Sequence, residues 1–144
     1  MFGALALLVA GAFAFYYYVN SRSEVGKRAL SIKRMALIET ALEKYCVDCG
    51  GNLPTEKQGL KALLQRPTES PVPRGWRGPY LEDTETVQDA WGRAYKYVCP
   101  GGPVERRSKI MRPYDLASYG RDGQEGGVDL DRDICSWDRG TMIP

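Results

Sequence analysis

Four aspartates near the C-terminal end are the residues best suited to chemistry: Asp122, Asp129, Asp131 and Asp133. Three glycines lie between the first and the last of them. Carboxylates this close together repel one another unless a cation lies between them, and Ca²⁺ prefers about 6–8 oxygen ligands of this kind. The spacing is not that of an EF-hand. A solvated acidic loop with Asx-turns is the alternative, and spacing alone leaves both open.

Four cysteines form the second group: Cys46, Cys49, Cys99 and Cys135. In a domain outside the cytosol, an even number of cysteines favours structural disulfides. Three pairings are possible, and the tentative choice is Cys46–Cys49 with Cys99–Cys135, because the first two are close in sequence. The Cys-Val-Asp-Cys spacing also fits a redox pair or half of a zinc site, and these alternatives stay open.

Composition excludes several classes of function. The chain contains no histidine, which removes histidine-based catalytic triads and most zinc or haem ligation. Lys plus Arg number 20 against 18 Asp plus Glu. Without a basic block or interleaved aromatic residues, nothing indicates a nucleic-acid partner.

These groups must be positioned by a long N-terminal helix. Residues 1–19 carry no charge, and a helix needs about 20 apolar residues to span a bilayer. An uncleaved signal peptide is the alternative. No proline occurs before Pro54, so nothing ends the helix at the membrane surface. We predict a transmembrane helix segment at residues 1–20 and a globular domain at residues 21–144, in which residues 21–49 continue the helix.

The second half of this helix shows an apolar stripe at helical spacing. The predicted stripe consists of Leu30, Leu37, Ala41 and Tyr45, with Ile38, Leu42 and Cys49 at its edge and Arg28, Glu39 and Glu43 on the opposite side. Arg34 interrupts it. This half should therefore pack on the globular domain.

Local signals predict the rest of the domain. Gly50 and Gly51 should end the helix, and Thr55 with Gln58 forms a capping box before a short helix at Leu60–Leu64. A Pro- and Gly-rich loop follows, with Trp76 turned inward. Strands are expected at residues 93–99 and 114–118, joined through a polar tip at residues 105–109. The expected fold class is α+β: a long N-terminal helix, transmembrane in one half and amphipathic in the other, packed on a small antiparallel β-sheet.

Five segments, taken in order, resemble the major pseudopilins of type II secretion systems, in the type IV pilin-like superfamily. They are Ile38–Tyr45, Asn52–Leu60, Asp89–Tyr97, Ser118–Gly127 and Asp133–Trp137. The resemblance implies a pilin-like fold with Ca²⁺ bound in the loop before the last strand. Its ligands would be Asp122 and the Asp-rich run Asp129, Asp131 and Asp133, with the main-chain carbonyl of Tyr119.

The resemblance also implies a function. We expect a structural subunit, not an enzyme, that polymerises into the periplasmic pseudopilus and aids export of folded proteins. Its partners would be other copies of itself, minor pseudopilins, the inner-membrane secretion platform and, before assembly, membrane lipid. The expected location is the bacterial inner membrane, as a single-pass protein with a periplasmic C-terminal domain. Alternatives are a minor pseudopilin, a type IV pilin subunit or a membrane-tethered CxxC thiol oxidoreductase.

Three features depart from the family pattern. Leu5 occupies the fifth position, where the family has Glu, and counting back from Pro54 the chain starts about four residues later than usual. We therefore expect either that residues precede Met1 or that leader processing differs. Four cysteines are also unusual, and as disulfides each bridge would add about 2–4 kcal/mol.

Overall fold

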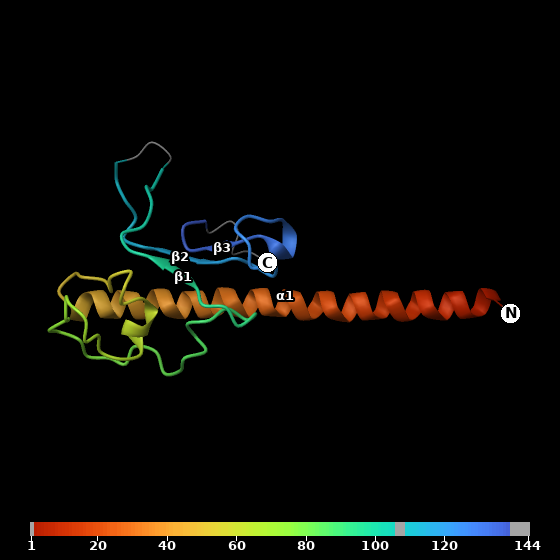
Figure 1. Cartoon of the computed structure of the whole chain (residues 1–144), viewed down its shortest axis with the longest axis horizontal. Coiled ribbons are helices and arrows are strands. Elements are labelled where there is room, and N and C mark those ends of the chain that lie inside the picture. The colour runs from red at the N-terminus through yellow and green to blue at the C-terminus, as the bar shows by residue number, and fades with distance from the viewer. Residues whose placement is uncertain (1, 106–108, 139–144) are drawn as a thin grey trace.

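The computed structural model describes residues 2–105 and 109–138, without the side chains of residues 2–14, 17, 20 and 21. Helix α1 (Phe2–Asp48) is continuous over 47 residues. Figure 1 shows that all other elements lie along the C-terminal part of α1, while its N-terminal part extends beyond them. One long helix followed by a small sheet confirms the α+β class.

The predicted transmembrane segment would lie in the N-terminal part of α1. Among the residues whose side chains are described, no helix has a stretch long and apolar enough to cross a membrane. Most side chains of residues 1–20 are not among those described. The transmembrane segment therefore stays a prediction, as does the boundary at residue 21.

The end of α1 follows the sequence closely. Gly50 and Gly51 have φ values of 66° and 87°, in the left-handed region that glycine enters without strain. The N–H of Gly51 donates to the carbonyl of Cys46 at 2.8 Å. This bond satisfies one of the carbonyls left unpaired at a helix end, and the predicted helix end is confirmed.

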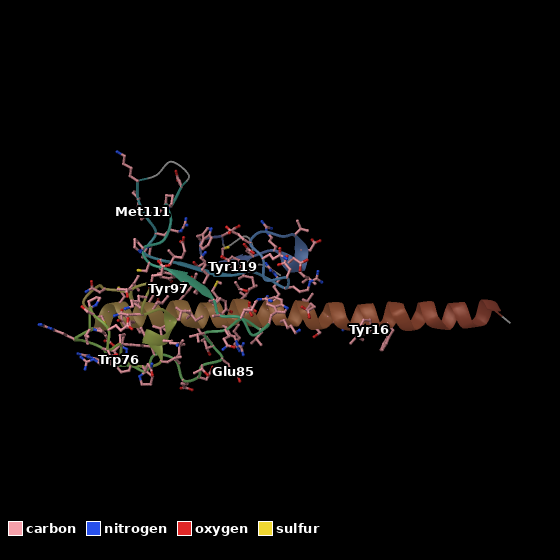
Figure 2. The ribbon with its side chains drawn as sticks, in the orientation of Figure 1. Tyr16, Trp76, Glu85, Tyr97, Met111 and Tyr119 are labelled. Carbon is pink, nitrogen blue, oxygen red and sulfur yellow. The ribbon has the colours of Figure 1, made fainter. Side chains whose placement is uncertain are left out.

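The capping box is also confirmed. The N–H of Gln58 donates to Thr55 Oγ1 at 3.2 Å, and the N–H of Thr55 donates to Gln58 Oε1 at 3.0 Å. The helix that follows, η1 (Leu60–Leu63), is a single 3₁₀ turn. Trp76 packs inward as predicted, and its Nε1–H donates to the carbonyl of Ala62 at 2.9 Å. Figure 2 shows it near the C-terminal end of α1.

The predicted apolar stripe of α1 is partly wrong. The buried face contains Met35, Ile38, Ala41, Leu42 and Tyr45, each at most 2 % exposed. Leu30 and Leu37 are 43 % and 48 % exposed. Arg28, expected on the solvent side, is buried, and its Nη1 donates to the carbonyl of Arg132 at 2.6 Å. The buried face of α1 is polar at its N-terminal end. A prediction from hydropathy alone therefore does not identify that part of the face.

The sheet is antiparallel and small. Its strands are β1 (Lys96–Val98), β2 (Asp115–Ser118) and β3 (Ile134–Cys135), in the order β1-β2-β3. The register pairs Tyr97 with Leu116 and Ser118 with Ile134. These four residues are buried. They share one face of the sheet, because residues two apart on a strand, and residues paired across neighbouring strands, point to the same side. The sheet thus packs this face against the core of α1.

An arm formed by residues 99–105 and 109–113 projects from the sheet (Figure 1). A bridge between Pro103 and Met111 joins its two sides, and Figure 2 shows Met111 well away from α1. The predicted hairpin tip at residues 105–109 includes residues 106–108, which lie outside the described residues.

The corrected helix face predicts the effect of paired substitutions. We expect Leu42→Ala to lower the free energy of unfolding by about 2–5 kcal/mol, because it leaves a cavity in the core. The matched control, Leu37→Ala, should change it by less than about 0.5 kcal/mol, because Leu37 is exposed. Urea unfolding of the full chain in detergent, followed by circular dichroism, measures both. Equal losses in the two variants would contradict this assignment of the helix face.

Candidate functional site

The acidic loop, residues 119–133, connects β2 to β3 and contains the 3₁₀ turn η2 (Asp129–Asp131). In Figure 1 it is the blue segment beside α1. Its backbone is folded tightly: a Cβ at Gly120 or Gly127 would lie 2.5 or 2.6 Å from the carbonyl oxygen of Asp131. Both glycines also have positive φ. Only glycine fits these two positions, so the loop has a defined shape and is not a loose tail.

Asp131 is engaged within the loop. Arg121 Nε and Nη2 donate to its two carboxylate oxygens at 2.7 and 2.8 Å. This two-bond pairing is the strong form of an arginine–carboxylate contact. The hydrogen bonds from Arg121 hold the pKa of Asp131 below its usual range.

Asp133 has one oxygen that is paired and one that is not. Its Oδ2 accepts from the N–H of Gly126 at 3.0 Å. Its Oδ1 is buried and has no hydrogen-bond partner among the described residues. A buried carboxylate oxygen without a partner is costly, and it is the kind of atom that a hard cation such as Ca²⁺ would bind.

The remaining predicted ligands adopt turn conformations. Asp122 Oδ1 accepts from the N–H of Gln124 at 3.1 Å. This hydrogen bond forms an Asx-turn. Asp129 is exposed and has a φ of 53°. The carbonyl of Tyr119 accepts from the N–H of Gly123 at 3.0 Å. All five predicted ligands thus lie in one loop, but across the described part of the chain no three acidic or cysteine side chains converge as metal ligands would. Calcium binding stays a prediction.

Sequence reasoning missed Asp89, the buried carboxylate that supports this loop. Asp89 is 1 % exposed. It accepts from the N–H groups of Trp91 and Arg93 at 3.0 and 2.9 Å and from the hydroxyl of Ser118 at 2.8 Å. Arg93 in turn donates to the carbonyl of Gly120. The Asp-Ala-Trp-Gly sequence was a turn signal that could have indicated this role.

The turn at residues 89–93 is held against the polar end of the α1 face. Trp91 Nε1–H donates to Glu24 Oε2 at 2.7 Å, and Lys27 pairs with the other oxygen of Glu24 at 2.9 Å. These contacts lower the pKa of Glu24, the bond from Trp91 most of all. Ser31 accepts from the N–H of Ala90 at 2.9 Å. The helix therefore positions the turn, and the turn positions the acidic loop.

The four cysteines are free thiols in this structure. Strand β2 lies between Cys99, which follows β1, and Cys135 in β3. Neighbouring strands are about 4.8 Å apart, so this register does not bring these two sulfurs together. Burial raises the pKa of Cys49, and it raises that of Cys135 to about 11. A redox or nucleophilic thiol needs a lowered pKa, so these two environments do not favour thiol chemistry.

Comparison with known proteins gives a consistent result. The family described as "Type II secretion system (T2SS), protein G" matches residues 18–137. The chain is similar to proteins named type II secretion system core protein G. In Pseudomonas aeruginosa the identity is 37 %, over 83 % of this chain and 78 % of the relative. In Dickeya chrysanthemi the identity is 32 %, over 95 % of this chain and 82 % of the relative.

A solved structure is similar as well. It is the crystal structure of the major pseudopilin from the type 2 secretion system of enterohaemorrhagic Escherichia coli. The TM-score is 0.60 at 30 % identity, and the match covers 81 % of this chain and 91 % of that one. The expected pilin-like arrangement is thereby confirmed.

The contact between Glu24 and Trp91 predicts a pH dependence. A carboxyl whose pKa is lowered on folding stabilises the protein above its unfolded pKa, and this contribution is lost as the pH falls through the folded pKa. We expect Glu24→Gln to lower the melting temperature at pH 7, and the two melting curves to converge in acid. Thermal melts from about pH 8 to pH 3 measure this. Glu43→Gln, on the exposed face, should follow the wild type; a constant offset for Glu24→Gln at every pH would contradict the prediction.

Proposed function

Because the chain belongs to the type II secretion system protein G family, we infer that it is a structural subunit that polymerises into the periplasmic pseudopilus of a type II protein secretion system. The observation that carries this inference is the family match across residues 18–137. That range includes the second half of α1, the sheet and the acidic loop together. The similarity to a solved major pseudopilin supports the same conclusion.

The architecture suits a fibre subunit. The N-terminal part of α1 extends beyond the domain, as Figure 1 shows. In our proposal this part lies in the inner membrane before assembly, and identical helices replace the lipid around it in the fibre. The small residues of this segment, such as Gly3, Ala6 and Gly11, would allow close helix packing. The subunit performs no chemistry; minor pseudopilins and the inner-membrane platform are the other proposed partners.

The alternatives receive less support. A minor pseudopilin or type IV pilin subunit would share the long helix and sheet, but the similar solved structure is a major pseudopilin. A thiol oxidoreductase would use Cys46 and Cys49. Burial raises the pKa of Cys49, whereas thiol exchange depends on the thiolate.

We further propose that Ca²⁺ binds the acidic loop. The unpartnered Oδ1 of Asp133 supports this proposal, and Asp122 with the carbonyl of Tyr119 would supply further oxygens. The ion would relieve the repulsion among the carboxylates and hold the loop against β3. Asp131 would keep its pairing with Arg121.

Fibre formation tests the subunit function. We expect the full-length chain, expressed in a bacterium whose own protein G gene is deleted but whose other secretion components remain, to form fibres and to restore export. Electron microscopy and assay of the exported proteins measure these results. The control is the same strain with an empty vector. A chain that stays monomeric in the membrane and restores nothing would contradict the proposed function.

Calcium removal tests the metal proposal. Because a ligand that binds only the folded state stabilises it, we expect Ca²⁺ to raise the melting temperature and a chelator to reverse the rise. Asp133→Asn should abolish the rise, while Glu125→Gln in the same loop should retain it. Differential scanning calorimetry of the full chain in detergent measures this. Identical melting with and without Ca²⁺ would remove the metal from the proposal.

A further inference from the structure

The globular domain has opposite charges at its two ends. Residues 50–80, which surround the C-terminal end of α1 in Figure 1, contain five Lys or Arg and two Glu, a net charge of +3. The acidic loop contains five Asp or Glu and two Arg, a net charge of −3. All five cations of the first segment are exposed: Lys57, Lys61, Arg66, Arg74 and Arg77.

Part of the basic end is hollowed into a groove of about 390 Å³. We name it the basic groove. Three cations line it, Lys57, Lys61 and Arg66, over a floor that includes the buried residues Ala62 and Pro67.

The wall of the basic groove is fixed by hydrogen bonds. Gln58 Nε2 donates to the carbonyls of Glu69 and Pro71 at 3.0 and 2.9 Å. Lys57 pairs with Glu69 at its rim at 2.9 Å. The side chain of Lys61 makes no hydrogen bond or ion pair within the described part of the chain, so its charge is available to a partner.

The outer tip of the acidic loop matches this groove in chemistry. Glu125, Val128 and Asp129 are exposed, Val128 at 73 %. The side chains of Glu125 and Asp129 make no hydrogen bond or ion pair among the described residues. Asp131, by contrast, forms an ion pair with Arg121. The tip therefore offers two uncommitted carboxylates on either side of an apolar side chain.

The two surfaces of one chain do not meet. The acidic loop is tied to α1 at Arg28 through Arg132, whereas η1, which carries part of the basic groove, lies against the C-terminal part of α1, as Figure 1 shows. Two copies shifted along a common axis can bring them together. A contact between different patches on identical chains repeats without closing when each copy is also displaced along the axis.

We propose that the basic groove of one copy binds the acidic-loop tip of a second copy, and that this contact joins successive subunits of the fibre. The proposal rests on the proposed function, since it names a contact within that polymer. Lys61 would approach Glu125 and Asp129, while Val128 would lie between the aliphatic stems of Lys61 and Arg66. Electrostatic complementarity of this kind chooses the register and partner more than it adds affinity.

Charge reversal tests the contact in the full-length chain, expressed with the other secretion components and at constant Ca²⁺. The first variant is Lys57→Glu with Lys61→Glu, and the second is Glu125→Lys with Asp129→Lys. Each variant alone should reduce the number of fibres, counted by electron microscopy, at least tenfold. The reason is that both ends of the domain then carry a net charge of the same sign. The chain with all four substitutions, and the two variants co-expressed, should each recover at least half of the wild-type count.

The outcomes separate this contact from the subunit function itself. Full fibre counts in both single-end variants would overturn the proposed contact and leave the subunit function intact. Loss of fibres without recovery in the co-expressed pair would also overturn it. No fibres from the wild type would instead contradict the proposed function. As a control, Glu43→Lys with Lys44→Glu, on the exposed face of α1, should assemble normally.

Discussion

The domain depends on the docking of one face of α1 against segments with little regular structure of their own. The strands are two to four residues long, and a sheet of this size gains little stability by itself. Its inward residues, Leu116 and Ile134, are fully buried with Leu42 and Ile38 of the helix in one core. The sheet and loops are therefore ordered because the helix supplies the other half of that core.

Polar contacts continue this docking toward the N-terminal end of the face. Glu24 accepts from Trp91, Ser31 from Ala90, and Arg28 donates to Arg132. The buried Asp89 then connects the turn that the helix holds to Ser118 at the end of β2. Buried polar groups need partners of defined geometry. These contacts therefore fix where the acidic loop begins, next to Ser118, and where it ends, at Arg132.

Features set by near neighbours in sequence were predictable, and those set by distant partners were not. The capping box of Thr55 and Gln58 and the glycines after α1 depend on residues a few positions apart, and both were predicted correctly. Arg28 was placed on the wrong side because its partner, Arg132, is 104 residues away. Asp89 was missed although its bonds to Trp91 and Arg93 are local, because its contact with Ser118, 29 residues away, forms only in the folded chain. In the acidic loop the residue types were visible in the sequence, but the pairing of Arg121 with Asp131 and the unpaired oxygen of Asp133 required the folded loop.

The unbroken course of α1 from Phe2 to Asp48 has a mechanical consequence. The domain is attached to this rod along its side, at Glu24, Arg28, Ser31 and the core residues, and not through a hinge at one end. Rotation or axial displacement of the rod must therefore carry the domain with it as a rigid body. Force applied to the N-terminal part would be shared as shear among many lateral contacts, and no single bond would bear the whole load.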